Sequence, residues 1–178
     1  ADIATMNNVL DDMLSSVEVD AAASTSTSVA MSALAAVDSM RVLADEAGVA
    51  VWLQGGDGVQ VAVPATRLTR CFVALIDNAI HHSPKDSTVQ VTITSTPTTV
   101  VIDVSDEGSG IHGVDPVRIF DRFAHSTSGR RRGFGLGLAL VRDITDRAHG
   151  SVRVASTSNS GTTIRLTLPR LRADQASS

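Results

Sequence analysis

FVALIDNAIHHSP, residues 72–84, is the most informative stretch of this sequence. It has the apolar spacing of an amphipathic helix that Pro84 brings to an end. Asn78, His81 and His82 fall on a stripe beside the apolar face, three and four residues apart. An amide in that position is costly unless it has a partner. It is therefore either an ordinary surface amide or an oxygen ligand offered to a hard cation such as Mg²⁺.

A second informative stretch is DEGSGI, residues 106–111, which follows a strand predicted at Thr99–Val104. Asp106 at the strand end supplies a fixed carboxylate, and Gly108 and Gly110 leave backbone that a flat ligand can approach closely. A carboxylate accepts hydrogen bonds, and the amino group of adenine donates them. The alternative interpretation is a common turn that contains an Asp.

The third stretch, GFGLGL at residues 133–138, opens a helix predicted from about Leu138 to Ala148. Glycines just before a helix let its first N–H groups meet a phosphate, helped by the helix dipole. The spacing does not match G-x-G-x-x-G, no parallel βαβ unit is predicted around it, and the Walker pattern is absent. The stretch therefore indicates a phosphate loop of another kind.

The remaining pattern predicts an α+β fold. Three β-hairpins, interrupted by helices, predict a mixed sheet with helices on one face, a two-layer α/β sandwich. The hairpins are expected at 49–53 with 59–63, at 89–95 with 99–104, and at 151–156 with 163–168. The chain of 178 residues is 43% hydrophobic and has a net charge of −4, so it can bury a core and is not expected to bind nucleic acid or a membrane surface. Its single cysteine, Cys71, excludes an internal disulfide and a multi-thiolate zinc site.

Taken together and in this order, these stretches resemble the sensor histidine kinases. Residues 72–84 resemble their N box, residues 106–111 their first glycine box, Ile119–Phe123 (IFDRF) their F box, and residues 133–141 their second glycine box. His149–Ser151 and Gly161–Ile164 are similar to the closing strands of the family. The resemblance covers about Leu34 to Leu168. It implies the GHKL (Bergerat-type) fold, shared with gyrase-type, chaperone and mismatch-repair ATPases.

The resemblance also implies a nucleotide site, with ATP and Mg²⁺ lying between the N-box helix and a mobile lid. Asn78 would hold Mg²⁺ and the phosphates, Asp106 would bind the adenine amino group, and Thr162 would support it through water. Gly108, Gly110 and the adjoining Ile111 would let the nucleotide approach. The lid would be built from Gly133, Gly135, Leu136, Gly137 and Leu138 at its phosphate end and from Phe120 and Phe123 at its start. Arg118, Arg122 and Arg130–Arg132 would screen phosphate charge, although the arginine run can equally be a solvated loop.

Two positions depart from the family pattern. Ala74 stands where many members carry a second Asn, and His81 stands where a Lys or Arg is usual. Both changes remove a metal or phosphate contact, because a neutral imidazole carries little charge at pH 7. His82 fits the Tyr/His position of the family and is expected to pack and orient. Nucleotide binding is expected to survive in a weaker form.

The predicted domain organisation has four parts. Residues 1–17 carry an a/d seam and resemble the tail of a dimerisation helix, unless they form an ordinary amphipathic helix folded back on the domain. Residues 18–28 are expected to be a linker, residues 29–169 the GHKL ATP-binding catalytic domain, and residues 170–178 a disordered tail.

None of the five histidines lies in the acceptor motif of a histidine kinase, in which an acidic residue follows the His. The resemblance therefore implies the catalytic half of a protein-histidine kinase, inactive alone. It would use a dimerisation domain that carries the acceptor His, and a response regulator downstream. A cytoplasmic location is expected, in a parent protein that can itself be membrane-anchored. The alternatives are a nucleotide-sensing module that transfers nothing and an anti-sigma-factor-type serine kinase.

Overall fold

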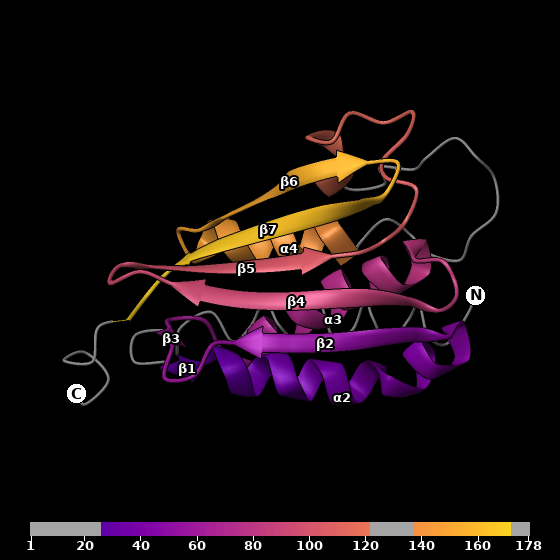
Figure 1. Cartoon of the computed structure of the whole chain (residues 1–178). Coiled ribbons are helices and arrows are strands. Elements are labelled where there is room, and N and C mark those ends of the chain that lie inside the picture. Colours follow the sequence, from indigo (N-terminus) through magenta and orange to yellow (C-terminus); the bar gives the residue numbers. More distant parts are fainter. Residues whose placement is uncertain (1–25, 122–136, 172–178) are drawn as a thin grey trace, which may run out of the picture.

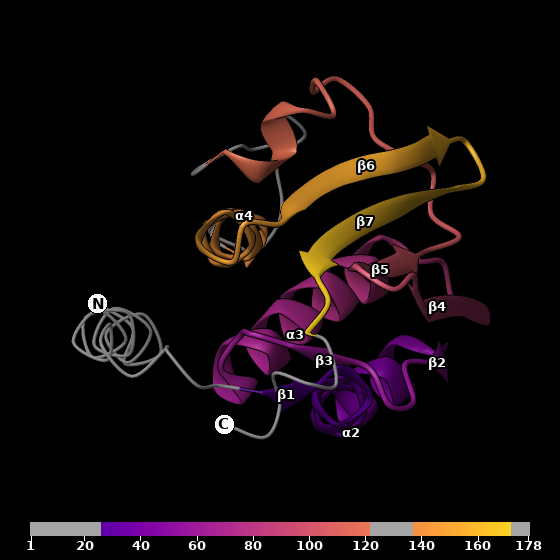
Figure 2. The same ribbon diagram turned by 90° about the vertical axis from the view of Figure 1, so that its left-hand side faces the viewer.

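The computed structural model describes residues 26–121 and 137–171, which form two layers. The first layer is a five-stranded sheet in the order β2-β4-β5-β7-β6. Its strands are β2 (Val49–Gly55), β4 (Ser87–Ser95), β5 (Thr99–Ser105), β6 (Ser151–Ser158) and β7 (Gly161–Pro169). Helices α2 (Val29–Ala47), α3 (Ala65–His82) and α4 (Gly137–Arg147) lie on one side of that sheet (Figures 1 and 2). The predicted mixed sheet with helices on one face is confirmed.

The core lies between the sheet and the helices because the strands alternate. Along β4, β5 and β7, every second side chain is buried, as the period-2 pattern requires. The apolar face of α3 packs onto these side chains, with Phe72 and Leu75 fully buried. The opposite face of the sheet is polar, and there Arg165 donates two hydrogen bonds of 2.7 Å to the carboxylate of Asp103.

One predicted hairpin is wrong. β2 does not pair with the segment that follows it but runs parallel to β4 over seven residue pairs. The short strand β3 (Gln60–Val61) pairs instead with β1 (Thr27–Ser28) in a separate two-stranded sheet. Gly55, Gly56 and Gly58 all have positive φ and turn the chain out of the five-stranded sheet. A pattern read along the chain favours the nearest strand and cannot detect a parallel partner that lies beyond a helix.

The ends of the domain also differ from the expectation. Thr27 and Ser28 belong to the folded part, and the Ser28 hydroxyl caps α2 by accepting from the N–H of Met31 at 3.4 Å. At the other end, the N–H groups of Arg170 and Leu171 donate to backbone carbonyls at 2.9 Å, so the expected disordered tail does not begin at Arg170. The expected dimerisation-helix remnant, residues 1–17, lies outside the described residues. In the described ranges, no helix combines the length and the apolar character that a membrane span needs.

Cys71 provides a test of the core. It lies on the buried face of α3, is 1% exposed, and burial raises the pKa of its thiol to about 12, an effect that the charge of Arg70 partly offsets. The unfolded chain releases this proton near its ordinary pKa of about 8.5, whereas the folded chain retains it. Above that pH the unfolded state binds fewer protons, so the free energy of unfolding falls as pH rises, by up to about 1.4 kcal/mol per pH unit.

We predict that this alkaline loss of stability, measured by urea unfolding between pH 7 and 10.5, is smaller in Cys71→Ala. The alanine variant is expected to be less stable at pH 7 because it leaves a cavity, so the comparison is made between the slopes. Equal slopes in the two proteins would show that Cys71 is not shielded as the structure indicates.

Candidate functional site

Asp106 follows β5 directly, and backbone groups hold its carboxylate in place. Its Oδ1 accepts hydrogen bonds from the N–H of Gly108 at 2.8 Å and from the N–H of Thr162 at 3.2 Å. Its own N–H donates to the Thr162 carbonyl at 2.9 Å. Its Oδ2 has no hydrogen-bond partner among residues 26–121 and 137–171. One carboxylate oxygen is therefore fixed by the protein, and the other is left as an acceptor for a ligand.

Gly108 and Gly110 lie where the backbone of other segments approaches closely, a requirement that the sequence did not predict. A Cβ on Gly108 would lie 2.4 Å from the backbone oxygen of His82, at the end of α3. Gly110 has a φ of +83°, and a Cβ there would lie 2.2 Å from the backbone oxygen of Ser158. Both glycines are thus required by the close approach of protein backbone, which brings the 106–111 loop against α3 on one side and against β6 on the other.

The hairpin between β6 and β7 contributes two further residues, Gly161 and Thr157. A Cβ on Gly161 would lie 2.1 Å from the backbone oxygen of Asp106. The Thr157 hydroxyl accepts from the N–H of Ile111 at 2.9 Å and is 3.2 Å from the hydroxyl of Thr162. Gly161 belongs to the segment Gly161–Ile164, which resembles a closing strand of the family. Thr157 belongs to no such segment and reaches the site only because the β6–β7 register pairs it with Thr162. No local pattern indicates that register.

On α3, Asn78 and His81 lie one turn apart but differ in availability. The Asn78 side chain is half-buried and makes no hydrogen bond to any other described residue, so its amide is available. The Nδ1 of His81 lies 2.8 Å from the backbone oxygen of Asp77 and 3.2 Å from its carboxylate. His81 is therefore engaged with its own helix through Nδ1, which leaves only Nε2 for a ligand.

The beginning of α4 lies against α3. A Cβ on Gly137 would be 3.6 Å from the Cβ of Ala74, so a side chain at the start of α4 would come into van der Waals contact with the small residue that replaces the second Asn of the family. The half-buried side chain of Leu138, the next residue, packs against the hydrophobic core. The structure describes α4 from Gly137 onward, and N–H groups at the start of a helix can receive an anion.

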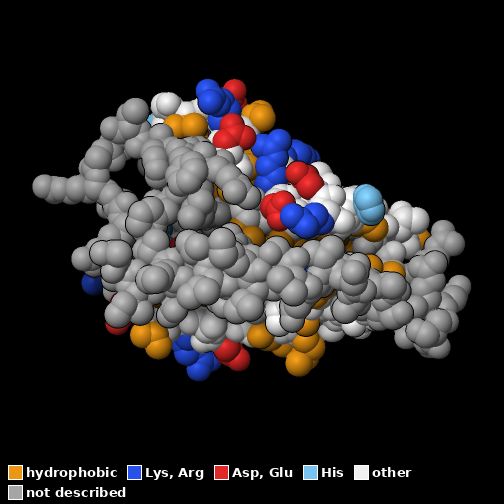
Figure 3. All heavy atoms as spheres, turned by 180° about the vertical axis from the view of Figure 1, so that it is seen from behind, with side chains coloured by type: hydrophobic (Ala, Val, Ile, Leu, Met, Phe, Trp, Pro, Cys, Tyr) orange, Lys and Arg blue, Asp and Glu red, His pale blue; other side chains and the backbone are white. Residues whose placement is uncertain are grey.

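The short 3-10 helix η2 (Arg118–Phe120) lies next to α4. Phe120 is buried, and Asp121 forms ion pairs with Arg142 at 3.1 Å and with Arg118 at 3.6 Å. Seen from behind in Figure 3, basic and acidic side chains alternate on the upper part of the described surface. The other predicted lid residues, namely Arg122, Phe123, Arg130–Arg132, Gly133, Gly135 and Leu136, lie outside the described residues.

Four segments far apart in the sequence thus come together. The end of α3 contacts Gly108, the following loop contacts β6, the β6–β7 hairpin contacts Asp106, and the start of α4 contacts Ala74. The result is a two-layer α/β domain in which the loop that begins with Asp106 at the end of a central strand contacts the end of α3 and the β6–β7 hairpin. Helix α3 carries Asn78, whose amide has no partner among the described residues.

Comparison with known proteins identifies this class. Residues 63–172 match the family described as histidine kinase-, DNA gyrase B- and HSP90-like ATPase. The chain therefore belongs to that ATPase family, as the sequence motifs indicated.

Individual relatives are sensor kinases. The sensor-like histidine kinase SenX3 of Mycobacterium bovis is 34% identical over 139 residues, 76% of this chain and 34% of SenX3. The solved mycobacterial sensor histidine kinase MprB superposes with a TM-score of 0.72 at 25% identity, covering 83% of this chain and 99% of that one. Full-length ShkA in complex with AMPPNP also gives 0.72, at 22% identity, over 84% of this chain and 31% of that one. The chain spans about a third of the length of the SenX3 relatives it matches.

Proposed function

We propose that this chain is the ATP-binding, catalytic part of a two-component sensor histidine kinase. The observation that carries the proposal is the Asp106 carboxylate, which is fixed through Oδ1 by two N–H groups and keeps Oδ2 as an acceptor. Family membership supports an ATP ligand, and the AMPPNP complex of the similarly folded ShkA supports binding of an adenine nucleotide. The whole protein would then pass phosphate from ATP to histidine.

The described residues include groups that suit both the adenine end and the phosphate end of ATP. Asp106 Oδ2 would accept a hydrogen bond from the adenine amino group, and Thr162, joined to Asp106 by two backbone hydrogen bonds, would keep the carboxylate in register. Ile111, held by Thr157, would lie beside the base. Gly137 and Leu138 at the start of α4 would offer backbone N–H groups to the phosphates.

The metal in this proposal is Mg²⁺, held in part by Asn78. The amide of Asn78 has no partner among the described residues, and a neutral oxygen suits Mg²⁺ when phosphate oxygens and water complete the coordination. Ala74 cannot contribute a metal ligand, and His81 is engaged with Asp77 and lacks the fixed charge that Lys would offer a phosphate, so we expect the metal and the phosphates to be held by fewer protein groups than Asn at 74 and Lys at 81 would allow.

The transfer itself would need a second domain. An imidazole nitrogen of the acceptor His attacks the γ-phosphorus of ATP, the bond from that phosphorus to the bridging oxygen breaks, and ADP leaves while the imidazole loses its proton. Phosphoryl transfer asks the protein mainly for positioning and charge stabilisation. This chain would supply ATP, metal and orientation, and a dimerisation domain outside it would supply the His. A response regulator would receive the phosphoryl group on an Asp.

The adenine contact is tested with Asp106→Asn. The amide oxygen can still accept from Gly108 and Thr162, so the loop should keep its fold, but an NH₂ group now faces the adenine amino group. Two donors then oppose each other, and ATP affinity should fall by about tenfold or more. Calorimetry with Glu107→Gln, the exposed neighbouring carboxylate, serves as the matched control. Equal affinities of Asp106→Asn and wild type would remove Asp106 from the adenine site.

The metal contact is tested with Asn78→Ala. ATP affinity is measured with and without Mg²⁺, and the variant should lose most of the tightening that Mg²⁺ causes in the wild type while retaining metal-free binding. Gln90→Ala, an amide on the opposite face of the sheet, is the control and should behave as wild type. If Mg²⁺ tightens binding equally in Asn78→Ala, the amide has a structural role only.

The reaction is tested by mixing this chain with γ-labelled ATP and a separately supplied dimerisation domain of a related sensor kinase. We expect acid-labile, base-stable label on the supplied domain and none on this chain alone. Proximity rather than a covalent link is what the transfer needs. Acid-stable phosphoserine on a partner would indicate the serine kinase alternative. ATP binding without transfer to any supplied acceptor would favour the nucleotide-sensing module, and Asp106→Asn serves as the inactive control.

A further inference from the structure

The strand β2 is an edge strand without the usual protection. It ends the five-stranded sheet, and β4 is its only strand partner among the described residues. Its sequence, VAVWLQG, has no charge and no proline, and its seven pairs with β4 run without a bulge. Proteins normally protect a free edge with charge, proline or a bulge, because its open N–H and C=O groups are a template for another strand. An edge of this kind favours pairing with a further chain.

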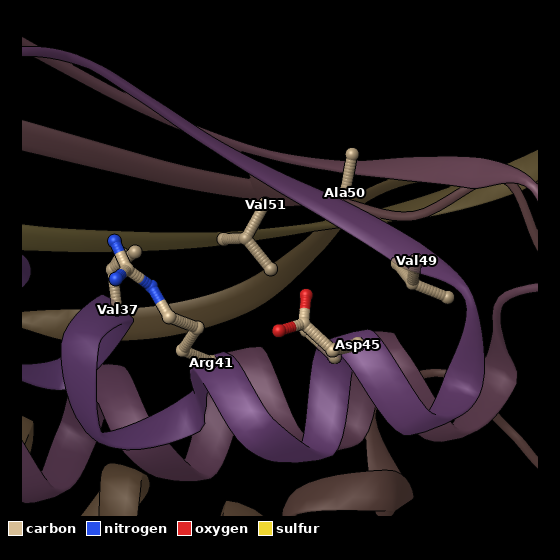
Figure 4. A pocket seen from close by; sticks show the side chains of 7 residues that line it. Val37, Arg41, Asp45, Val49, Ala50 and Val51 are labelled. Atoms are coloured by element: carbon tan, nitrogen blue, oxygen red, sulfur yellow. The ribbon is translucent and has the colours of Figure 1, made fainter.

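A pocket of about 170 Å³ lies beside this edge, between β2 and α2. Figure 4 shows Val51 pointing from the strand toward the helix, while Arg41 and Asp45 point from the helix toward the strand. Val37, Ala44 and Val49 add apolar lining. Asp45 forms no ion pair with another described residue, and Arg41 has only an exposed, 4.0 Å contact with Asp38. The pocket thus combines an apolar surface with one available cation and one available anion.

Several large apolar side chains around this edge are exposed, beside the charged groups of α2. Trp52, the only tryptophan of the chain, lies at the middle of β2 and is 66% exposed. On α2, Leu34 and Val42 are 48% and 69% exposed. In Figure 3, hydrophobic side chains are visible along the lower rim, where α2 lies, with a basic and an acidic group between them. The edge and the adjoining helix face therefore have the composition of an interface.

We propose that β2 pairs antiparallel with β2 of a second copy of this chain, around a twofold axis near Trp52. The strand suits itself as a partner: Val51 and Leu53 would continue the apolar, helix-facing side of the sheet, and Ala50, Trp52 and Gln54 its outer side. No like charges would meet along the two strands, because β2 has none. A twofold axis that passes between the two edge strands, perpendicular to the sheet, keeps both α2 helices on the same face of the joined sheet. The same patch is then used on both copies, so the interface is isologous.

Charge complementarity supports a second copy in particular. With the two α2 helices antiparallel across the axis, Arg41 of each copy would face Asp45 of the other, so that one cation and one anion per chain satisfy each other twice. The contact area of one edge strand and part of one helix is small, so a weak, concentration-dependent dimer is expected. The interface uses α2 and β2, none of whose residues belongs to the proposed nucleotide site.

The experiment uses charge reversal on the 178-residue chain, measured by sedimentation velocity at increasing protein concentration. The wild type should dimerise, and Trp52 emission should shift to shorter wavelength as it does. Arg41→Glu places Glu against Asp45, and Asp45→Arg places Arg against Arg41, so each variant alone should self-associate about tenfold more weakly or not at all. An equimolar mixture of the two variants should form a heterodimer, because both charge pairs are then restored.

Circular dichroism and ATP affinity should be unchanged in both variants, which separates a failed interface from a failed fold or a failed nucleotide site. A wild type that stays monomeric at all concentrations would overturn the proposal. So would single variants that dimerise as the wild type does, or a mixture that does not recover association. Failure here would leave the proposed kinase function untouched, because that function is tested by nucleotide binding and transfer.

Discussion

The site depends on the fixation of one carboxylate at the end of a central strand. Oδ1 of Asp106 accepts two backbone hydrogen bonds, one from its own loop and one from the β6–β7 hairpin. A half-buried carboxylate held in this way keeps one geometry, because breaking either contact would leave an N–H group without a partner. The glycines around it follow from the same constraint. Gly108 and Gly161 stand where a side chain would collide with backbone oxygen, so the loop, the helix α3 and the hairpin can close on Asp106 only without a Cβ at these positions.

Helix α3 serves the core and the site at once. Its apolar face packs Phe72 and Leu75 against the sheet, which fixes the rotation of the helix about its axis. That rotation then decides where the adjoining stripe points, and this stripe carries Asn78, whose amide is unpaired among the described residues. A substitution in the buried face would therefore be expected to disturb the site through the angle of the helix, although it touches no ligand.

The substitutions at positions 74 and 81 have a common physical consequence. The side chain of Ala74 faces the start of α4 at Gly137 and can provide no oxygen, and His81 is engaged with Asp77 through Nδ1. Each reduces the number of polar groups that the helix can offer to phosphates and metal. If the proposed nucleotide site is correct, fewer groups of α3 would contact the phosphates and the metal than Asn at 74 and Lys at 81 would provide.

Local sequence patterns were sufficient to predict many of the secondary-structure elements and part of the candidate site. The amphipathic spacing around residues 72–84, the hairpins ending in β5 and β7, and the position of Asp106 at a strand end are all properties of short stretches, because helix and strand periodicity and turn chemistry act over a few residues. The parallel pairing of β2 with β4, the place of Thr157 beside Ile111, and the backbone contacts that require Gly108 and Gly161 were decided only by tertiary structure. These contacts join residues that are far apart in the chain, and which of them form depends on how the whole core packs rather than on any local preference.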